Sequence, residues 1–238
     1  MANEPNATSR FAPRYSEVPT FMRAPLIRDP SKLDIALVGV PFDAGAENRP
    51  GQRHGPREIR NMSSLTRSVH HVTKINPYEL CRIGDMGDVA FPWAFDLEKS
   101  HADITRFYET LREADVAPLS AGGDHSISLP ILRAIAARQP VGMVHIDAHT
   151  DTCDEELGSR FTHGTPFRRA VEEGVLDPKR VVQIGIRGAQ NSEEGWASPL
   201  TLECALSSSK NLVGLVWRRS LRSCGVRSGT VQPTCLSI

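Results

Sequence analysis

The chain has 238 residues, which is enough for one sizeable α/β domain or for two small ones. Its 28 Lys and Arg residues balance 28 Asp and Glu residues, so no overall charge attracts nucleic acid or an acidic membrane. The content of 39% hydrophobic and 24% charged residues is typical of a globular protein, and no apolar run approaches the roughly 18–20 residues of a membrane span.

The N-terminal residues and the cysteines predict a cytoplasmic protein. The first residues, MANEPNATSRFAPRYSEVP, have no apolar core and therefore do not form a secretory signal. The five cysteines show neither CxxC pairs nor regular spacing, so they indicate neither a zinc ribbon nor a disulfide framework.

The order of the predicted elements indicates an α/β fold. Residues 1–32 are proline-rich and lack periodicity, which predicts an N-terminal arm. From there on, apolar runs typical of buried parallel strands alternate with amphipathic stretches typical of helices. The predicted strands are 34–40, 80–90, 116–120, 141–146 and 181–186, and the predicted helices are 56–65, 97–114, 126–138 and 165–173. Ligands of such sheets bind beyond the carboxyl ends of the strands.

Acidic and imidazole side chains gather at two of these strand ends. In VHIDAHTD, Asp147, His149 and Asp151 alternate along the chain where a strand opens into a loop, so they can converge. His125 follows a double glycine at another predicted strand end. Any one of these residues alone would be read as a loop cap. Together, with no Lys or Arg close by in sequence and no thiolate, they predict a metal site that favours Mn²⁺, while zinc and iron stay open.

Three motifs make this interpretation specific. GGDHSIS, VHIDAHTDT and FTHGTPFRRA, in this order, resemble the ureohydrolase family of arginases and agmatinases, and the resemblance runs from about residue 14 to residue 197. It implies a three-layer α/β/α domain on a mainly parallel sheet, with two Mn²⁺ ions. It also implies an enzyme that hydrolyses a guanidino group to urea and an amine, and a homo-oligomer for an intact chain.

The resemblance also implies roles for individual residues. The family's ligands of one ion match His125 and Asp151, its ligand of the other ion matches His149, and the carboxylate that bridges both ions matches Asp147. His163 resembles the catalytic histidine that transfers protons. We expect Asp124 and His145 to hold the ligands in place rather than to bind metal.

The substrate is less clear from the sequence. The acidic loop 154–156 favours a cationic tail, as in agmatine, which we take as the first candidate because the motif set looks agmatinase-like. Arg160 could instead pair with the carboxylate of a guanidino acid such as 4-guanidinobutyrate. A loop of solvated charges is the third interpretation.

The composition changes near residue 197. Residues 198–238 contain five Lys and Arg but only one acidic residue, Glu203, and the chain has no Asp after Asp177. The family's late strand reads Y-V-S-F-D-x-D, and its two aspartates complete both metal sites. That motif is missing here.

Codon degeneracy suggests a reason. Shifted by one frame, codons allowed for residues 230–238 spell G-P-T-Y-V-S-F-D, and those for 202–212 spell an apolar strand with an acidic end. This predicts a frameshift near residue 197, with an incomplete ureohydrolase domain over 33–197 and an out-of-frame tail over 198–238. A genuine divergent tail and a basic nucleic-acid-binding arm are the alternatives. A chain with such a tail would be a catalytically inactive product.

Overall fold

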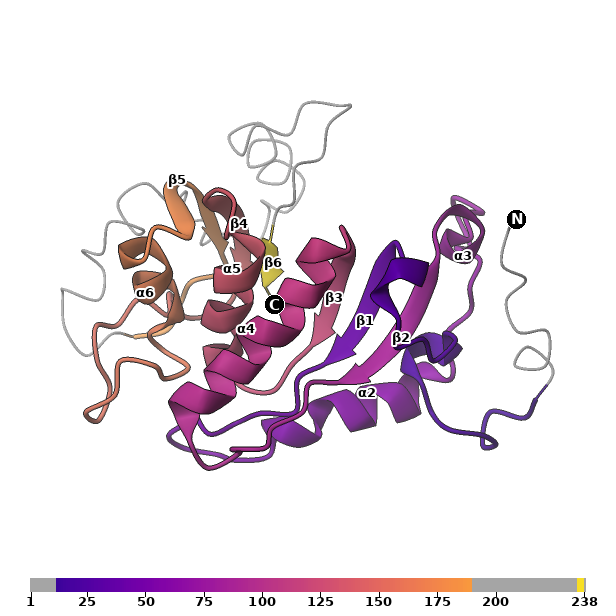
Figure 1. Ribbon diagram of the computed structural model, residues 1–238, viewed down its shortest axis with the longest axis horizontal. Coiled ribbons are helices and arrows are strands. Elements are labelled where there is room, and N and C mark those ends of the chain that lie inside the picture. The colour runs from indigo at the N-terminus through magenta and orange to yellow at the C-terminus, as the bar shows by residue number, and fades with distance from the viewer. Residues whose placement is uncertain (1–11, 190–234, 238) are drawn as a thin grey trace. The chain divides into compact units, whose positions relative to one another are not determined.

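The computed structural model describes residues 12–189 and 235–237. Of the tail predicted over 198–238, only residues 235–237 are described. Residues 1–11 of the predicted arm also lie outside the described residues. The described chain forms two compact units, which divide after Asp124, with residues 45–47 joining the second unit. Each unit has its own three-stranded parallel sheet (Figure 1).

In the first unit the strand order is β2-β1-β3, with Ile35 opposite both Ile83 and Ala117. The chain crosses from β1 to β2 through α2 and returns from β2 to β3 through α4. Because parallel crossovers are right-handed in nearly all sheets and these two run in opposite directions, we expect the two helices to cover opposite faces of the sheet. The elements of this unit are η1 (Phe21–Arg23), η2 (Pro30–Lys32), β1 (Ile35–Gly39), η3 (Gln52–His54), α2 (Gly55–Ser63), α3 (Pro77–Leu80), β2 (Ile83–Asp88), α4 (Leu97–Glu113) and β3 (Ala117–Ala121).

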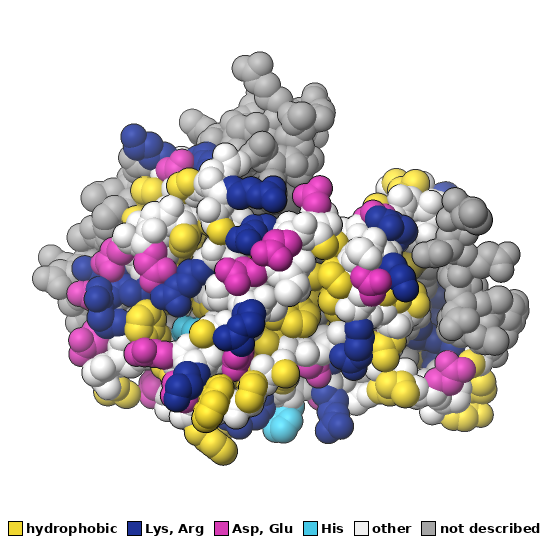
Figure 2. All heavy atoms as spheres, in the orientation of Figure 1, with side chains coloured by type: hydrophobic (Ala, Val, Ile, Leu, Met, Phe, Trp, Pro, Cys, Tyr) yellow, Lys and Arg dark blue, Asp and Glu magenta, His cyan; other side chains and the backbone are white. Residues whose placement is uncertain are grey.

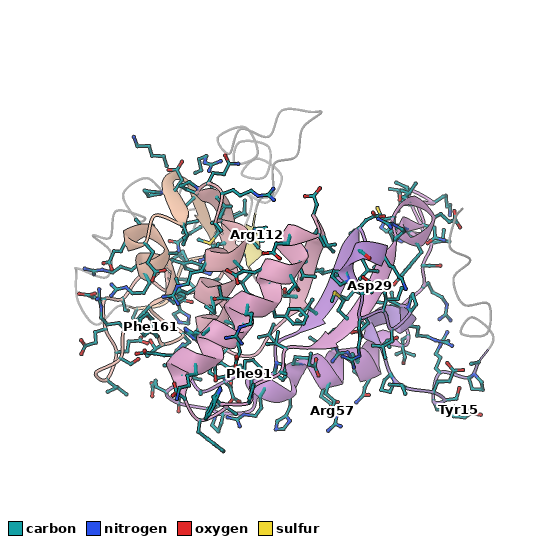
Figure 3. All side chains as sticks on the ribbon, viewed as in Figure 1. Tyr15, Asp29, Arg57, Phe91, Arg112 and Phe161 are labelled. Atoms are coloured by element: carbon teal, nitrogen blue, oxygen red, sulfur yellow. The ribbon has the colours of Figure 1, made fainter. Side chains whose placement is uncertain are left out.

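Local chemistry explains the longest of these helices. The side chain of Asp96 accepts a hydrogen bond from the Lys99 N–H and so caps the start of α4. Ile104, Tyr108 and Leu111 recur at helical spacing and are buried. On α2 most side chains point outward, as Arg57 does in Figure 3.

A buried arginine joins α2 to the sheet of the first unit. Arg60 binds the Asp85 carboxylate through Nε at 2.8 Å and through Nη2 at 3.0 Å, and it binds Asp88 at 2.6 Å. Its guanidinium lies 4.0 Å from the ring centre of Phe21, whose N–H also donates to Asp85. The proline-rich arm is thereby anchored on Asp85 in the middle of β2.

We expect Arg60→Ala to lower the free energy of unfolding by about 3–5 kcal/mol, because it leaves the fully buried carboxylate of Asp85 without its cation. The control is Arg82→Ala, which removes a guanidinium from Asp34 in a half-exposed pair and should change stability little. Urea denaturation followed by circular dichroism measures both. Equal losses of unfolding free energy in the two variants would contradict the assignment of Arg60 as the stabilising partner of the buried Asp85 carboxylate.

In the second unit the strand order is β5-β4-β6, again parallel. Its elements are η4 (His125–Ile127), α5 (Ser128–Ile135), β4 (Val141–Ile146), α6 (Pro166–Glu172), β5 (Leu176–Ile184) and β6 (Cys235–Ser237). Side chains from α5, α6, β4 and β5 form one core, which includes Leu129, Leu132, Met143, Phe167, Ala170, Leu176 and Val181. Phe161, labelled in Figure 3, packs against this core from the loop before α6.

The predicted α/β class with a parallel sheet is confirmed. The strand predicted over 141–146 has these bounds in the structure. The strand predicted over 181–186 begins earlier, at Leu176, because Leu176 is buried in the core and extends the pairing with β4. Within the region predicted to be out of frame, the backbone of β6 pairs with β4 and places Ser237 opposite His145.

The surface carries both charges. Figure 2 shows Lys and Arg side chains interspersed with Asp and Glu side chains over the visible face. No helix among residues 12–189 is both long and apolar enough to cross a membrane.

Candidate metal centre

Four potential ligands meet at the carboxyl end of β4 in the second unit. One ligand atom each of His125, His145, Asp147 and Asp151 lies within 4.8 Å of the others. His125 opens η4, His145 belongs to β4, and the two aspartates lie in the loop that follows this strand. Asp147, Asp151 and His125 therefore converge as predicted, whereas His149, which was predicted to join them, is not among the four.

Asp147 faces two histidine groups with its two oxygens. Oδ2 lies 3.7 Å from Nδ1 of His125 and 3.5 Å from Nε2 of His145. Oδ1 lies 3.5 Å from Nδ1 of His149 and accepts a hydrogen bond of 2.8 Å from the His149 N–H. A carboxylate held in this way can contact two ions at once.

The loop carrying Asp151 is tied to α6. Asp151 adopts a left-handed backbone conformation with φ of 51°, and its carboxylate is hydrogen bonded to Nδ1 of His125. Its carbonyl accepts a hydrogen bond of 3.2 Å from the N–H of Phe167. The Phe167 ring lies 5.2 Å from the His125 ring and 4.6 Å from the His145 ring, so α6 holds the loop and both imidazoles.

His149 packs against the loop that follows β5. The N–H groups of Arg187 and Gly188 both donate to the carbonyl of Ala148, at 2.9 and 2.8 Å. A Cβ atom on Gly188 would lie 2.3 Å from Cδ2 of the His149 ring. Only glycine leaves this imidazole its position beside Asp147.

His163 does not belong to the four-residue group. Its N–H donates to the carbonyl of Gly45, and its Nε2 is buried without a hydrogen-bond partner among the described residues. The segment around it runs beside the metal loop, because the N–H of Cys153 donates to the carbonyl of Gly164. The neighbouring Thr162 hydroxyl donates to Glu156.

The charged side chains considered for the substrate tail are paired with one another. Arg160 binds Glu172 at 3.1 Å and lies 3.5 Å from Asp154. Asp154 accepts a hydrogen bond of 2.6 Å from Arg169, which is buried and also binds Glu172. Neither the acidic loop nor Arg160 therefore stands alone.

The electrostatics and donor chemistry of the cluster suit a divalent cation. Burial and the nearby imidazole of His125 lower the pKa of His145 to about 4. Burial opposes ionisation of Asp147, but the His149 N–H and the imidazoles hold the pKa of its carboxyl below the usual value. Within the described residues Asp147 and Asp151 form ion pairs only with histidines. Carboxylate and imidazole donors without thiolate fit Mn²⁺.

One side chain at the site, Gln183 of β5, escaped the sequence analysis. It is fully buried against His145, which was expected to support the ligands and whose imidazole lies within 4.8 Å of them. The one available signal was a polar residue inside the apolar stretch VVQIGI. Asp124, also expected to support the ligands, belongs to the first unit, where its N–H donates to the carbonyl of Phe42.

The protein has parallel α/β sheets, and imidazole and carboxylate groups that could hold a metal ion lie beyond the end of one strand. These features are those of a metal-binding protein of the α/β class. The sequence matches the arginase family over residues 33–216, and the chain belongs to this family. The match extends past residue 197, where the motif-based resemblance ends.

Individual relatives agree with this assignment. The chain is 55% identical to guanidinopropionase of Pseudomonas aeruginosa over 82% of its own length, and 41% identical to mitochondrial agmatinase of Gallus gallus over 88%. It covers 60% and 64% of the length of these two proteins. The solved structure of proclavaminate amidino hydrolase from Streptomyces clavuligerus superimposes with a TM-score of 0.85 at 33% identity, covering 94% of this chain and 74% of that one.

We expect Gly188→Ala to displace the His149 ring from Asp147 and to change the free energy of unfolding by less than about 1 kcal/mol, because the exposed His149 side chain can turn away. NMR shifts of the His149 ring and urea denaturation measure the two effects. The control is the same substitution in a His149→Ala background, where it displaces no ring and should leave the free energy of unfolding unchanged. Unchanged His149 shifts in Gly188→Ala would show that the overlap with His149 does not matter.

Proposed function

We propose that this protein is a Mn²⁺-dependent ureohydrolase, which hydrolyses a guanidino group to urea and an amine. The observation that carries the proposal is the Asp147 carboxylate, which turns one oxygen to His125 and the other to His149. His125 and Asp151 would hold one ion, His149 the other, and Asp147 both. Cytoplasmic location and homo-oligomeric assembly stay predictions.

The proposed chemistry follows from the weakness of a guanidinium as an electrophile, since its charge is delocalised. Mn²⁺, when bound by these residues, would supply the chemistry that lets water attack the guanidino carbon near neutral pH. The acidic surroundings of the site favour a cationic guanidino group. His163 would give a proton to the departing amine, since imidazole side chains serve as general acids in many enzymes. Its Nε2, which is buried and has no hydrogen-bond partner among the described residues, supports this role.

We propose a guanidino acid as the preferred substrate and keep agmatine as the second candidate. The relative named guanidinopropionase is 55% identical, whereas the one named agmatinase is 41% identical. The half-exposed Arg160 guanidinium beside the metal loop would pair with the carboxylate of such a substrate.

We further propose that the chain departs from its coding frame near residue 197, so that the domain over 33–197 is continued in another frame. The support is the absence of Asp after Asp177 and the shifted reading Y-V-S-F-D near the end. In that reading the codons of residues 237 and 238 supply the aspartate. In the pairing of β4 with β6, Ser237 lies opposite His145, which precedes Asp147 by two residues. An aspartate encoded at this end of β6 would therefore lie close to Asp147, where a second metal-binding carboxylate is needed.

The nucleotide sequence from about codon 190 onward, read on both strands, tests the frame proposal. We expect that inserting or deleting one base restores Y-V-S-F-D. A confirmed frame whose shifted reading lacks the metal motif would refute the frameshift, and the tail would then be genuine.

Urea release tests the function. We expect the frame-restored chain with MnCl₂ to release urea from 3-guanidinopropionate or 4-guanidinobutyrate faster than from agmatine. The 238-residue chain, which lacks the second pair of aspartates, should bind Mn²⁺ weakly and release little. His163→Asn in the restored chain should lower kcat by about 10²- to 10⁴-fold without weakening Mn²⁺ binding. Asp147→Asn should lower kcat and also weaken Mn²⁺ binding. No urea from any guanidino compound would contradict the proposed function.

A further inference from the structure

We propose that Gln183 fixes the ring proton of His145 on Nε2, so that His145 turns an N–H group toward the Asp147 carboxylate instead of offering a lone pair to a metal ion. Both residues would then be positioning residues for the carboxylate that faces two histidine groups. The inference rests on the proposed function, because it takes Asp147 as a metal ligand.

The first step is the orientation of the Gln183 amide. Its Nε2 lies 2.8 Å from the carbonyl oxygen of Thr150, which can only accept a hydrogen bond. An amide oxygen in that place would meet another oxygen at hydrogen-bond distance. The Thr150 carbonyl therefore determines which end of the Gln183 side chain is nitrogen, although the two ends have nearly the same shape.

The second step transfers this orientation to His145. The same Nε2 of Gln183 lies 3.0 Å from Nδ1 of the His145 ring. Since an amide nitrogen only donates, Nδ1 must accept, and it therefore carries no proton. The proton of this imidazole then resides on Nε2, where it leaves no lone pair for a metal ion.

The third step is the direction of that N–H. Nε2 of His145 points to Oδ2 of Asp147, 3.5 Å away, and is buried without a hydrogen-bond partner among the described residues. The His145 side chain is fully buried, and the Phe167 ring packs at 60° to the imidazole. An N–H group held at this distance favours the rotation of the carboxylate in which Oδ2 faces His145 and Oδ1 accepts from the His149 N–H.

The four clustered side chains therefore have different roles, although they lie close to one another. Of the four side chains within 4.8 Å of one another, three would bind the cation and His145 would hold the shared carboxylate. The tautomer is set from β5, the strand beside β4, through Gln183. A buried glutamine is needed at this point because neither an apolar residue nor a carboxylate donates two hydrogen bonds.

The tautomer is measured directly by ¹⁵N–¹H NMR on the metal-free, histidine-labelled full chain at neutral pH. The His145 signals are assigned by their loss in His145→Asn. We expect a protonated Nε2 and an unprotonated Nδ1 in the unmodified chain. A proton on Nδ1 there would overturn the proposal, and this readout needs no variant at Gln183 to fold.

Gln183→Glu provides the second test. Its carboxylate accepts instead of donating, so Nδ1 of His145 should become protonated in this variant. Mn²⁺ binding followed by calorimetry should weaken by about 10- to 100-fold. The control is Gln52→Glu, which makes the same change at an exposed residue of the first unit and should alter neither readout. An unprotonated Nδ1 in Gln183→Glu would overturn the proposal.

The two proposals fail separately. If the frame-restored chain binds no Mn²⁺ and forms no urea, the proposed function is wrong, yet the metal-free tautomer still reports on Gln183 and His145. If Mn²⁺ binds and urea forms while His145 carries its proton on Nδ1, the function stands and the positioning role of Gln183 is wrong.

Discussion

The second unit is organised around a concentration of negative charge at the end of β4. Asp147 and Asp151 lie together in a partly buried loop, and in the described residues only histidines form ion pairs with them. Two carboxylates at such close range repel each other, and burial raises the cost. A bound divalent cation removes this penalty, so the stability of the loop and its capacity to bind metal have the same origin.

The surrounding elements hold this loop from several sides. The ring of Phe167 on α6 packs against His125 and His145, while the turn at Gly188 leaves space for His149. Behind them a closely packed core of α5, α6, β4 and β5 fixes the helices to the sheet. The ligands come from separate segments, but each is positioned by regular structure and not by the loop alone.

Much of the site could be predicted because its signals are local. The strand 141–146 is a continuous apolar run, and the alternation of Asp147, His149 and Asp151 follows directly from strand geometry. The position of Gln183 could not be predicted, since it depends on the register between β4 and β5. A single polar residue in an apolar strand does not reveal which buried partner it meets.

Other features depend on tertiary contacts in the same way. The pairing of Arg160 with Glu172 requires α6 to lie beside the loop, and the sequence shows only that both charges exist. The need for glycine at position 188 appears only once the His149 ring is seen against its Cα atom. Motif spacing thus pointed to the candidate ligands, whereas the supporting contacts required the fold.

Anomalous diffraction at the manganese edge, from crystals of the full chain grown with MnCl₂, tests the central claim most directly. The account predicts an anomalous peak in contact with His125, Asp147 and Asp151, with the second oxygen of Asp147 turned to His149. A peak elsewhere, or no peak beside Asp147 at saturating Mn²⁺, would contradict it.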